Sequence, residues 1–180
     1  MGLIGRVLSF VRTSRNAAQV ADVKMDPGGG GVNVTAEHFA PPGDDAFPLG
    51  TDYVYAGATP QRGRVAAVGY IDPLNAPKAR RGEKRIYSRD SAGAVVADHW
   101  LKADGSVVTE NENGSVTLGA DGSILAQNAD GYFELQAGGA FVANGATATT
   151  DGDFVTSDGV SLRDHTHIGN FGSPTSKPII

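Results

Sequence analysis

The feature that most constrains how this chain can fold is the regular spacing of glycine in its second half. From Lys102 onward a glycine recurs every six to nine residues, and five of these glycines follow an aspartate, at 104–105, 121–122, 130–131, 151–152 and 158–159. An Asp-Gly pair tolerates the positive φ that a tight reversal requires. The spacing therefore predicts a repeat of strand, turn and strand, with strands of about four to six residues.

The apolar residues of this repeat fall on one narrow line, with Ser, Thr, Asn and Asp between them. Successive side chains of a strand point to opposite faces, so the line predicts one apolar face. Its members are Val116, Leu118, Ile124, Leu125, Phe133, Leu135, Phe141, Phe154 and Val155. A lone chain of this kind would expose both the apolar line and its open strand edges, a state that favours aggregation.

Two architectures would cover this line. Three chains wound about one axis would turn every apolar line inward and pair every strand edge with a neighbour. A single-chain parallel β-helix is the alternative, but it needs about 20 residues per coil, so about 60 residues would make only about three coils. We therefore favour an intertwined homotrimer, a trimeric β-helix, for this part of the chain.

The first half of the chain has a different composition, and the change falls near residue 90. Short β-prone runs separated by turn residues predict five strands, at 18–23, 32–36, 52–56, 64–71 and 84–89. Five short strands suit a small OB-fold barrel, so the whole chain is expected to be all-β apart from its N-terminus. The loop of Gly28 to Gly31 lacks the Lys-Ser/Thr of a phosphate-binding loop and predicts a flexible hairpin connection.

The N-terminal residues show a third pattern. Helical spacing of apolar residues predicts a short amphipathic helix or arm, formed by Leu3, Ile4, Val7, Leu8 and Val11. Arg6 interrupts the apolar run, so no signal peptide is expected here.

Composition narrows the classes of function. The net charge is −5 and the one cationic cluster is Lys78 to Arg81, which argues against nucleic-acid binding. The chain has no cysteine, so neither disulfides nor thiolate metal sites stabilise it. No segment approaches the ~20 apolar residues of a membrane-spanning helix.

The sharpest local motif is Asp164-His165-Thr166-His167, which follows the last Asp-Gly unit. In an extended backbone His165 and His167 project to the same side. A parallel trimer would bring six imidazoles to one ion and give octahedral coordination. Zinc prefers four tetrahedral ligands, whereas Fe(II), Co(II) and Ni(II) accept six imidazoles, and iron is the most available of these. We therefore expect one Fe ion per trimer, acting as a cross-link because no coordination position remains for water or substrate.

The histidines allow two other interpretations. A metal-dependent hydrolase needs further ligands and a general base, but His38 and His99 lie far from the motif in sequence, without a carboxylate cluster at ligand spacing. There is also no Gly-x-Ser-x-Gly nucleophile elbow, so we expect no enzymatic activity and ordinary structural roles for His38 and His99. A surface His-x-His in a polar tail is the other interpretation. The repeat before the motif and the turn-rich residues 168–178 after it favour the metal site.

Three segments of the chain resemble the baseplate central spike proteins of Mu-like contractile phages: Val68 to Pro73, Gly82 to Asp90 and the terminal Asp164-His165-Thr166-His167. The apolar spacing places the N-terminal arm or short helix at 1–15, and the resemblance implies that an OB-fold at 16–92 follows it and docks to the tail hub. It further implies a trimeric β-helical shaft at 93–162 and an iron-binding apex at 163–180 built on His165 and His167. Family members also hold calcium or chloride ions, and Asp164 is the candidate for such an ion or for supporting the histidines.

The function that this resemblance implies is that of a structural spike at the tip of a contractile phage tail, which punctures the host outer membrane during sheath contraction. Its partners would be copies of itself, the hub protein at the end of the tail tube and, transiently, the outer membrane. It would be made in the host cytoplasm and carried in the virion at the baseplate tip. The alternatives are a trimeric receptor-binding fibre tip and the spike of a related contractile injection or bacteriocin particle.

Overall fold

The computed structural model of the protein describes residues 2–15, 18–41, 43–61 and 63–168. Within these ranges the chain is all-β without helices, which confirms the expected class and leaves no candidate for a membrane-spanning helix. It divides into two compact units. The first comprises Met1–Pro77 and Arg89–Ala94, and the second comprises Lys78–Ser88 and Val95–Ile180.

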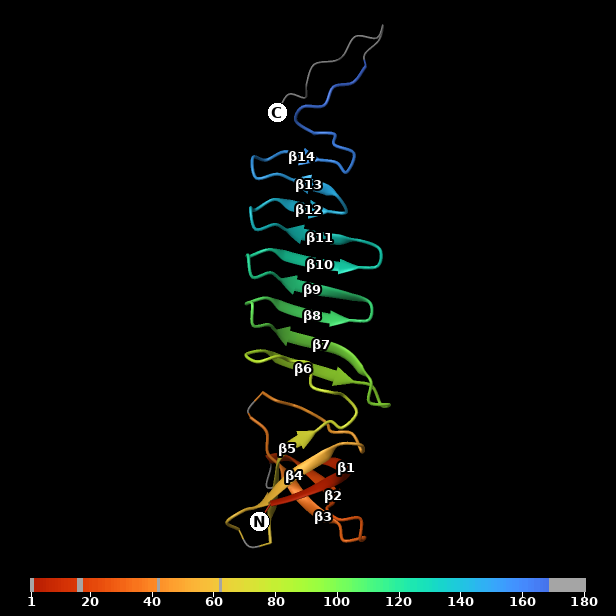
Figure 1. Ribbon diagram of the computed structural model, residues 1–180, viewed down its shortest axis with the longest axis vertical. Coiled ribbons are helices and arrows are strands. Elements are labelled where there is room, and N and C mark those ends of the chain that lie inside the picture. The colour runs from red at the N-terminus through yellow and green to blue at the C-terminus, as the bar shows by residue number, and fades with distance from the viewer. Residues whose placement is uncertain (1, 16–17, 42, 62, 169–180) are drawn as a thin grey trace. The chain divides into compact units, whose positions relative to one another are not determined.

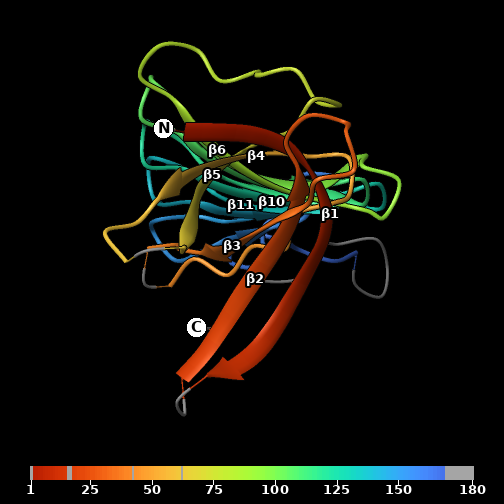
Figure 2. The same cartoon turned by 90° about the horizontal axis from the view of Figure 1, so that it is seen from below.

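The first unit is a closed five-stranded barrel with the strand order β1-β2-β3-β5-β4, as expected for this half of the chain. Strand β1 closes the barrel by pairing with both β2 and β4, and β3 pairs with β5 in parallel. Figure 2 shows the β1–β2 hairpin extending well beyond the other barrel strands. The strands are β1 (Gly2–Arg15), β2 (Ala18–Asp26), β3 (Val34–His38), β4 (Tyr53–Ala58) and β5 (Val65–Ile71).

The barrel encloses a conventional apolar core. Alternate residues of the strands point inward, as Val54 and Ala56 do in β4, and Leu3, Ala21, Val34, Val65 and Tyr70 pack around them. The buried members are Val7, Phe10, Val23, Met25, Ala36, Val54, Ala56 and Ala67. Burial of a valine, phenylalanine or methionine side chain stabilises a fold by about 1.5–3 kcal/mol, so this unit contains its own stabilising core.

The prediction of an N-terminal helix was wrong, because residues 2–15 form β1. A bulge between Val7 and Ser9 shifts the register of β1 against β2. Inward-facing residues are therefore Val7 before the bulge and Phe10 after it, with Leu3 also packed on the core. Spacings of four and three imitate a helical period, and this is why the sequence pattern was misleading.

The prediction that residues 84–89 complete the barrel was also wrong. These residues form β6 (Lys84–Arg89), which belongs to the sheet of the second unit, while β1 supplies the fifth barrel strand. The glycine loop, by contrast, behaves as expected. It connects β2 to β3, and Asp26 Oδ1 accepts hydrogen bonds from the backbone N–H groups of Gly28 and Gly29 at 3.1 and 2.7 Å.

The second unit is a nine-stranded sheet in which the strands follow one another in chain order (Figure 1). Each pairing from β7 to β14 is antiparallel and joins consecutive strands, so the single-chain parallel β-helix is wrong. Besides β6, its strands are β7 (Val95–Leu101), β8 (Val107–Asn111), β9 (Gly114–Leu118), β10 (Ile124–Asn128), β11 (Tyr132–Leu135), β12 (Phe141–Ala143), β13 (Ala146–Ala148) and β14 (Phe154–Val155).

One five-residue turn recurs along this sheet and explains the spacing of glycine. In each copy the first backbone N–H donates to the fifth carbonyl and the fourth N–H donates to the first carbonyl. The fourth residue is a glycine with positive φ, as the turn requires. The copies occupy residues 90–94, 102–106, 119–123, 136–140, 149–153 and 156–160.

The hairpins at the opposite edge of the sheet use asparagine. Asn111 Oδ1 accepts from the N–H groups of Asn113 and Gly114, and Asn128 Oδ1 accepts likewise from Asp130 and Gly131. The Asp130-Gly131 pair therefore does not form the predicted positive-φ reversal, because Gly131 lies in this asparagine-capped turn and lacks a positive φ. The other four Asp-Gly pairs have the positive φ expected of them.

Candidate functional site

One face of the second unit carries two rows of side chains that the strand register places next to one another. The central row contains His99, Thr109, Val116, Ala126, Phe133, Ala143 and Ala146. The outer row contains Leu101, Val107, Leu118, Ile124, Leu135, Phe141, Ala148 and Phe154. We call these two rows together the apolar face.

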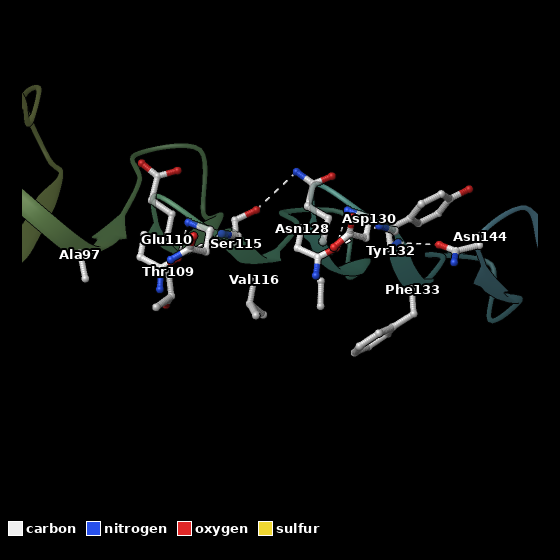
Figure 3. Close-up of a pocket in the computed structure, with 16 residues that line it drawn as sticks. Ala97, Thr109, Glu110, Ser115, Val116, Asn128, Asp130, Tyr132, Phe133 and Asn144 are labelled. Carbon is white, nitrogen blue, oxygen red and sulfur yellow. Dashed lines mark hydrogen bonds between the residues drawn. The ribbon is translucent and has the colours of Figure 1, made fainter.

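The apolar face is exposed in the single chain. Val116 and Phe133 keep 51% and 50% of their surface exposed, and Leu118 keeps 45%. Figure 3 shows Ala97, Val116 and Phe133 pointing to one side of the sheet, while Glu110 and Tyr132 point to the other. A groove of about 770 Å³ runs along the asparagine turns beside this face. A continuous exposed apolar surface of this kind marks an interaction site.

The opposite face is mixed in character. Its rows alternate valine, leucine and tryptophan with threonine, glutamate, serine and glutamine, for example Thr117 and Glu134 beside Leu125. The sequence prediction of one apolar line is therefore confirmed for Val116, Leu118, Ile124, Phe133, Leu135, Phe141 and Phe154. It is wrong for Leu125 and Val155, which the register places on the opposite face.

The segment from Gly82 to Asp90 contains a cluster of ion pairs that sequence reasoning missed. In the second unit Arg85 pairs with buried Asp98, and its guanidinium lies 5.0 Å from the Tyr87 ring and 5.6 Å from the Trp100 ring. Asp98 Oδ1 is buried without a hydrogen-bond partner among the described residues. No spacing in the sequence indicates that these two charges are paired.

Arg89 plays the corresponding role in the first unit. Its guanidinium donates to both carboxylate oxygens of Asp52, at 2.8 and 2.7 Å, and lies 3.1 Å from Asp72. Asp52 is only 2% exposed, and its Oδ2 also accepts the N–H of Leu49. Two arginines four residues apart in the chain thus each neutralise a buried carboxylate, one in each unit.

The predicted metal motif lies beyond the last strand, and Ser161 organises the residues around it. The Ser161 hydroxyl donates to Asp153 Oδ2 at 2.5 Å and accepts the backbone N–H of Asp164 at 2.9 Å. The backbone N–H of His165 donates to the Ser161 carbonyl at 3.0 Å. Asp164 therefore takes part in this turn through its backbone, and its side chain is exposed.

The two histidines of the motif lie side by side. Their ring centroids are 5.0 Å apart and the rings are nearly perpendicular, at 87°. His165 Nδ1 faces the carbonyl oxygens of Ser161 and Leu162 at 2.8 and 3.1 Å. Because carbonyl oxygens only accept, Nδ1 carries the proton and Nε2 carries the lone pair that can bind a metal.

The described residues of one chain supply two adjacent imidazoles, which is only part of a metal site. Within the described residues no group of three or more His, Cys, Asp or Glu side chains is placed to hold an ion. Two adjacent imidazoles with one Nδ1 fixed by backbone carbonyls suit a shared transition-metal site completed by other copies. Residues 169–180, which include most of the segment expected to close the apex, lie outside the described residues.

The other two histidines occupy different surroundings. His38 Nδ1 is 2.8 Å from the Tyr70 hydroxyl, and the His38 ring packs 5.5 Å from Phe10 in the barrel. Burial lowers the pKa of His38 and raises that of Tyr70 to about 12. His99 lies on the apolar face, where its Nδ1 is 2.8 Å from Thr109 Oγ1.

Searches against known protein families and curated proteins find no family model that matches the chain and no curated protein that matches it significantly.

Proposed function

We propose that this chain is the homotrimeric central spike of a contractile phage tail and acts mechanically, not as an enzyme. The observation that carries the proposal is the apolar face, which runs through every strand from β7 to β14 and has no covering element among the described residues. The partner that fits this face best is a second and third copy of the same chain. The resemblance of Gly82 to Asp90 and of the histidine motif to spike proteins supports the phage assignment.

The dimensions of the sheet are compatible with self-association about a threefold axis. Its strands have at most seven residues and its hairpins alternate between two edges. Three such sheets arranged as the sides of a prism would place every apolar face toward the axis. Because Val116, Phe133 and Leu118 are already about half buried in the single chain, covering what remains exposed would stabilise the assembly by about 1 kcal/mol per side chain. Eight strands per chain would make the prism long and stiff.

The histidine motif would close one end of this prism. His165 and His167 of three chains would supply six imidazole ligands, and Asp164 would support them or hold an additional ion such as calcium; a chloride ion is a further expectation from the resemblance. An iron ion there would cross-link three chain ends. Its role would be to keep these ends from separating under load.

In this proposal the barrel is an OB-fold that docks to the hub at the end of the tail tube, and the sheet transmits force. Sheath contraction would drive the narrow end of the trimer into the outer membrane. The Asp-Gly turns and the antiparallel strand pairing would resist compression along the length of the prism. No covalent bond would be made or broken.

The test is the mass and metal content of the purified full-length protein. Light scattering should give three chains per particle, and metal analysis should give one iron per three chains. His167→Ala should abolish iron binding and leave the trimer intact, because the apolar face does not include His167. Thr166→Ala is the matched control and should keep the iron.

A monomeric chain would contradict the proposal. A metal-free trimer that binds outer-membrane glycans through exposed histidines would instead support the receptor-binding fibre tip. A trimer with iron purified from a DNA-free particle would place the protein in a related injection or bacteriocin machine.

A further inference from the structure

His99 is an exception on the apolar face. In the central row its neighbours toward the tip are Thr109, Val116, Ala126 and Phe133. On the described strands β7 to β14 it is the one titratable side chain on this face, since the register places Asp98, Glu110 and Glu134 on the other. If copies of the chain cover this face, the imidazole becomes buried. A buried polar group without a hydrogen-bond or metal partner destabilises an interface. The His99 imidazole should therefore have such a partner in the assembly.

The structure fixes one nitrogen of this ring and leaves the other available. Nδ1 lies 2.8 Å from Thr109 Oγ1 on the neighbouring strand β8. Nε2 has no hydrogen-bond partner among the described residues. When Nδ1–H donates a hydrogen bond to the threonine hydroxyl, the Nε2 lone pair is free to coordinate. A polar group on the second nitrogen that sets the tautomer and orients the ring is the usual environment of a metal-binding histidine.

The neighbouring charges do not compete for this position. Asp98 precedes His99 but points to the opposite face, where Arg85 engages it. The next residues along β7 on the same side of the sheet are Ala97 and Leu101, which supply no ligand. A site here would therefore depend on imidazole from His99 alone, one per chain.

We propose that His99 residues of three copies form a three-imidazole site for one divalent transition-metal ion, in addition to the site at His165 and His167. This inference rests on the proposed threefold assembly. Three protein nitrogens leave a fourth position for water or a small anion, which is the tetrahedral arrangement that Zn²⁺ and Co²⁺ accept. Six imidazoles at the histidine motif leave no such position, so the two sites differ in coordination number.

Cobalt distinguishes the two sites, because four-coordinate Co²⁺ absorbs visible light strongly and six-coordinate Co²⁺ absorbs it weakly. The full-length trimer is stripped with a chelator and titrated with Co²⁺ alone. The variant His165→Ala/His167→Ala should bind one Co²⁺ per three chains with the strong spectrum. Adding His99→Ala should remove both the ion and the spectrum without changing the particle mass.

Two further variants keep the inference testable if the triple variant does not assemble. His99→Ala alone should bind one Co²⁺ fewer per trimer than the parent chain and lose only the strong absorption. Thr109→Val, which keeps the shape of the side chain, should weaken Co²⁺ binding at this site by about 10–100-fold.

The outcomes separate the two proposals. A trimer whose cobalt content and spectrum are unchanged by His99→Ala overturns the three-imidazole site and leaves the spike assembly standing. A parent chain that is monomeric by light scattering overturns the assembly, and the site with it.

Discussion

The barrel and the nine-stranded sheet place their apolar residues in opposite ways. Of the nine buried hydrophobic residues among those described, eight form the barrel core and one, Val142, lies in the sheet. The sheet has no shortage of apolar side chains, but it exposes them on one continuous face. The barrel is thus built to be stable as a single chain, whereas the sheet contains backbone pairing and repeated turns but lacks the burial that stabilises a fold.

The largest effect should come from placing a charge on the apolar face. In the proposed trimer, Phe133→Asp would bury three carboxylates near the threefold axis, so we expect self-association to be lost while the barrel stays folded. Tyr132→Asp is the matched control, because Tyr132 is the adjacent residue on the opposite face and is 39% exposed. Light scattering of both variants checks this. Equal loss of the trimer in both, or in neither, would remove the proposed distinction between the two faces.

A smaller but still large effect should follow from removing Arg89 of the barrel unit. Arg89→Met leaves buried Asp52 without its cation, and we expect a loss of about 3–5 kcal/mol in the free energy of unfolding. Denaturant titration of the full chain measures it. In the second unit Arg163, beyond the last strand, pairs with the exposed Asp151, and Arg163→Met should leave the unfolding midpoint unchanged. A similar loss of unfolding free energy in both variants would contradict the prediction that the buried ion pair contributes more to stability than the exposed one.

Sequence alone predicted those parts of the structure that depend on local patterns. The turns at Gly105, Gly122, Gly152 and Gly159 were predictable because a positive φ selects glycine at a fixed place in each hairpin. The apolar face was predictable from alternation over several strands. The closeness of His165 and His167 followed from their spacing, although the backbone there forms a turn and then irregular structure, not a strand.

Features that depend on long-range pairing were not predictable. The bulge near Ser9 changes which residues of β1 face the core, and nothing in residues 3–12 signals it. Closure of the barrel depends on β1 meeting β4. The placement of β6, by contrast, was open to prediction, because a five-residue glycine turn at 90–94 joins it to β7. The position of His99 on the apolar face was not predictable either, because it depends on the strand register that aligns His99 with Val116 and Phe133.

Substituting a glycine of the repeated turns should have a moderate effect on stability. Gly122 has a φ of 89° and open space where the methyl group of an alanine would lie, so Gly122→Ala costs backbone strain alone. We expect a loss of about 1–2 kcal/mol per chain, measured as a lower melting temperature of the sheet. Gly138→Ala is the matched control, because Gly138 also has open space but lacks a positive φ. Equal effects would mean that the turn does not impose the strain we assign to it.

The smallest expected effect is a difference between the barrel and the sheet in how their stability changes as the pH falls. Burial lowers the pKa of His38 below its ordinary 6.5, outweighing Asp44 and Asp45, which raise it. The unfolded chain therefore takes up the proton more readily, and the barrel loses stability as the pH falls below about 6.5. In the sheet, hydrogen bonds from Ser106 and Ser123 lower the pKa values of Asp104 and Asp121 below 3.8. A depressed carboxyl pKa stabilises the fold above about pH 4, and this contribution is lost only below it.

Between pH 7 and pH 5 the barrel of the chelator-stripped protein should therefore weaken, whereas Asp104 and Asp121 should contribute no change to the stability of the sheet. Fluorescence of Trp100, the only tryptophan, follows denaturant unfolding of the sheet. Pulsed hydrogen exchange at one labelling pH, read on peptides from β2 and β5, follows the barrel in the same samples. His38→Gln should abolish the barrel's change between these two pH values, since the amide does not titrate. The opposite result would be a change in the Trp100 unfolding midpoint between these pH values with no change in barrel stability. It would contradict the prediction, because the titrating group would then lie in the sheet.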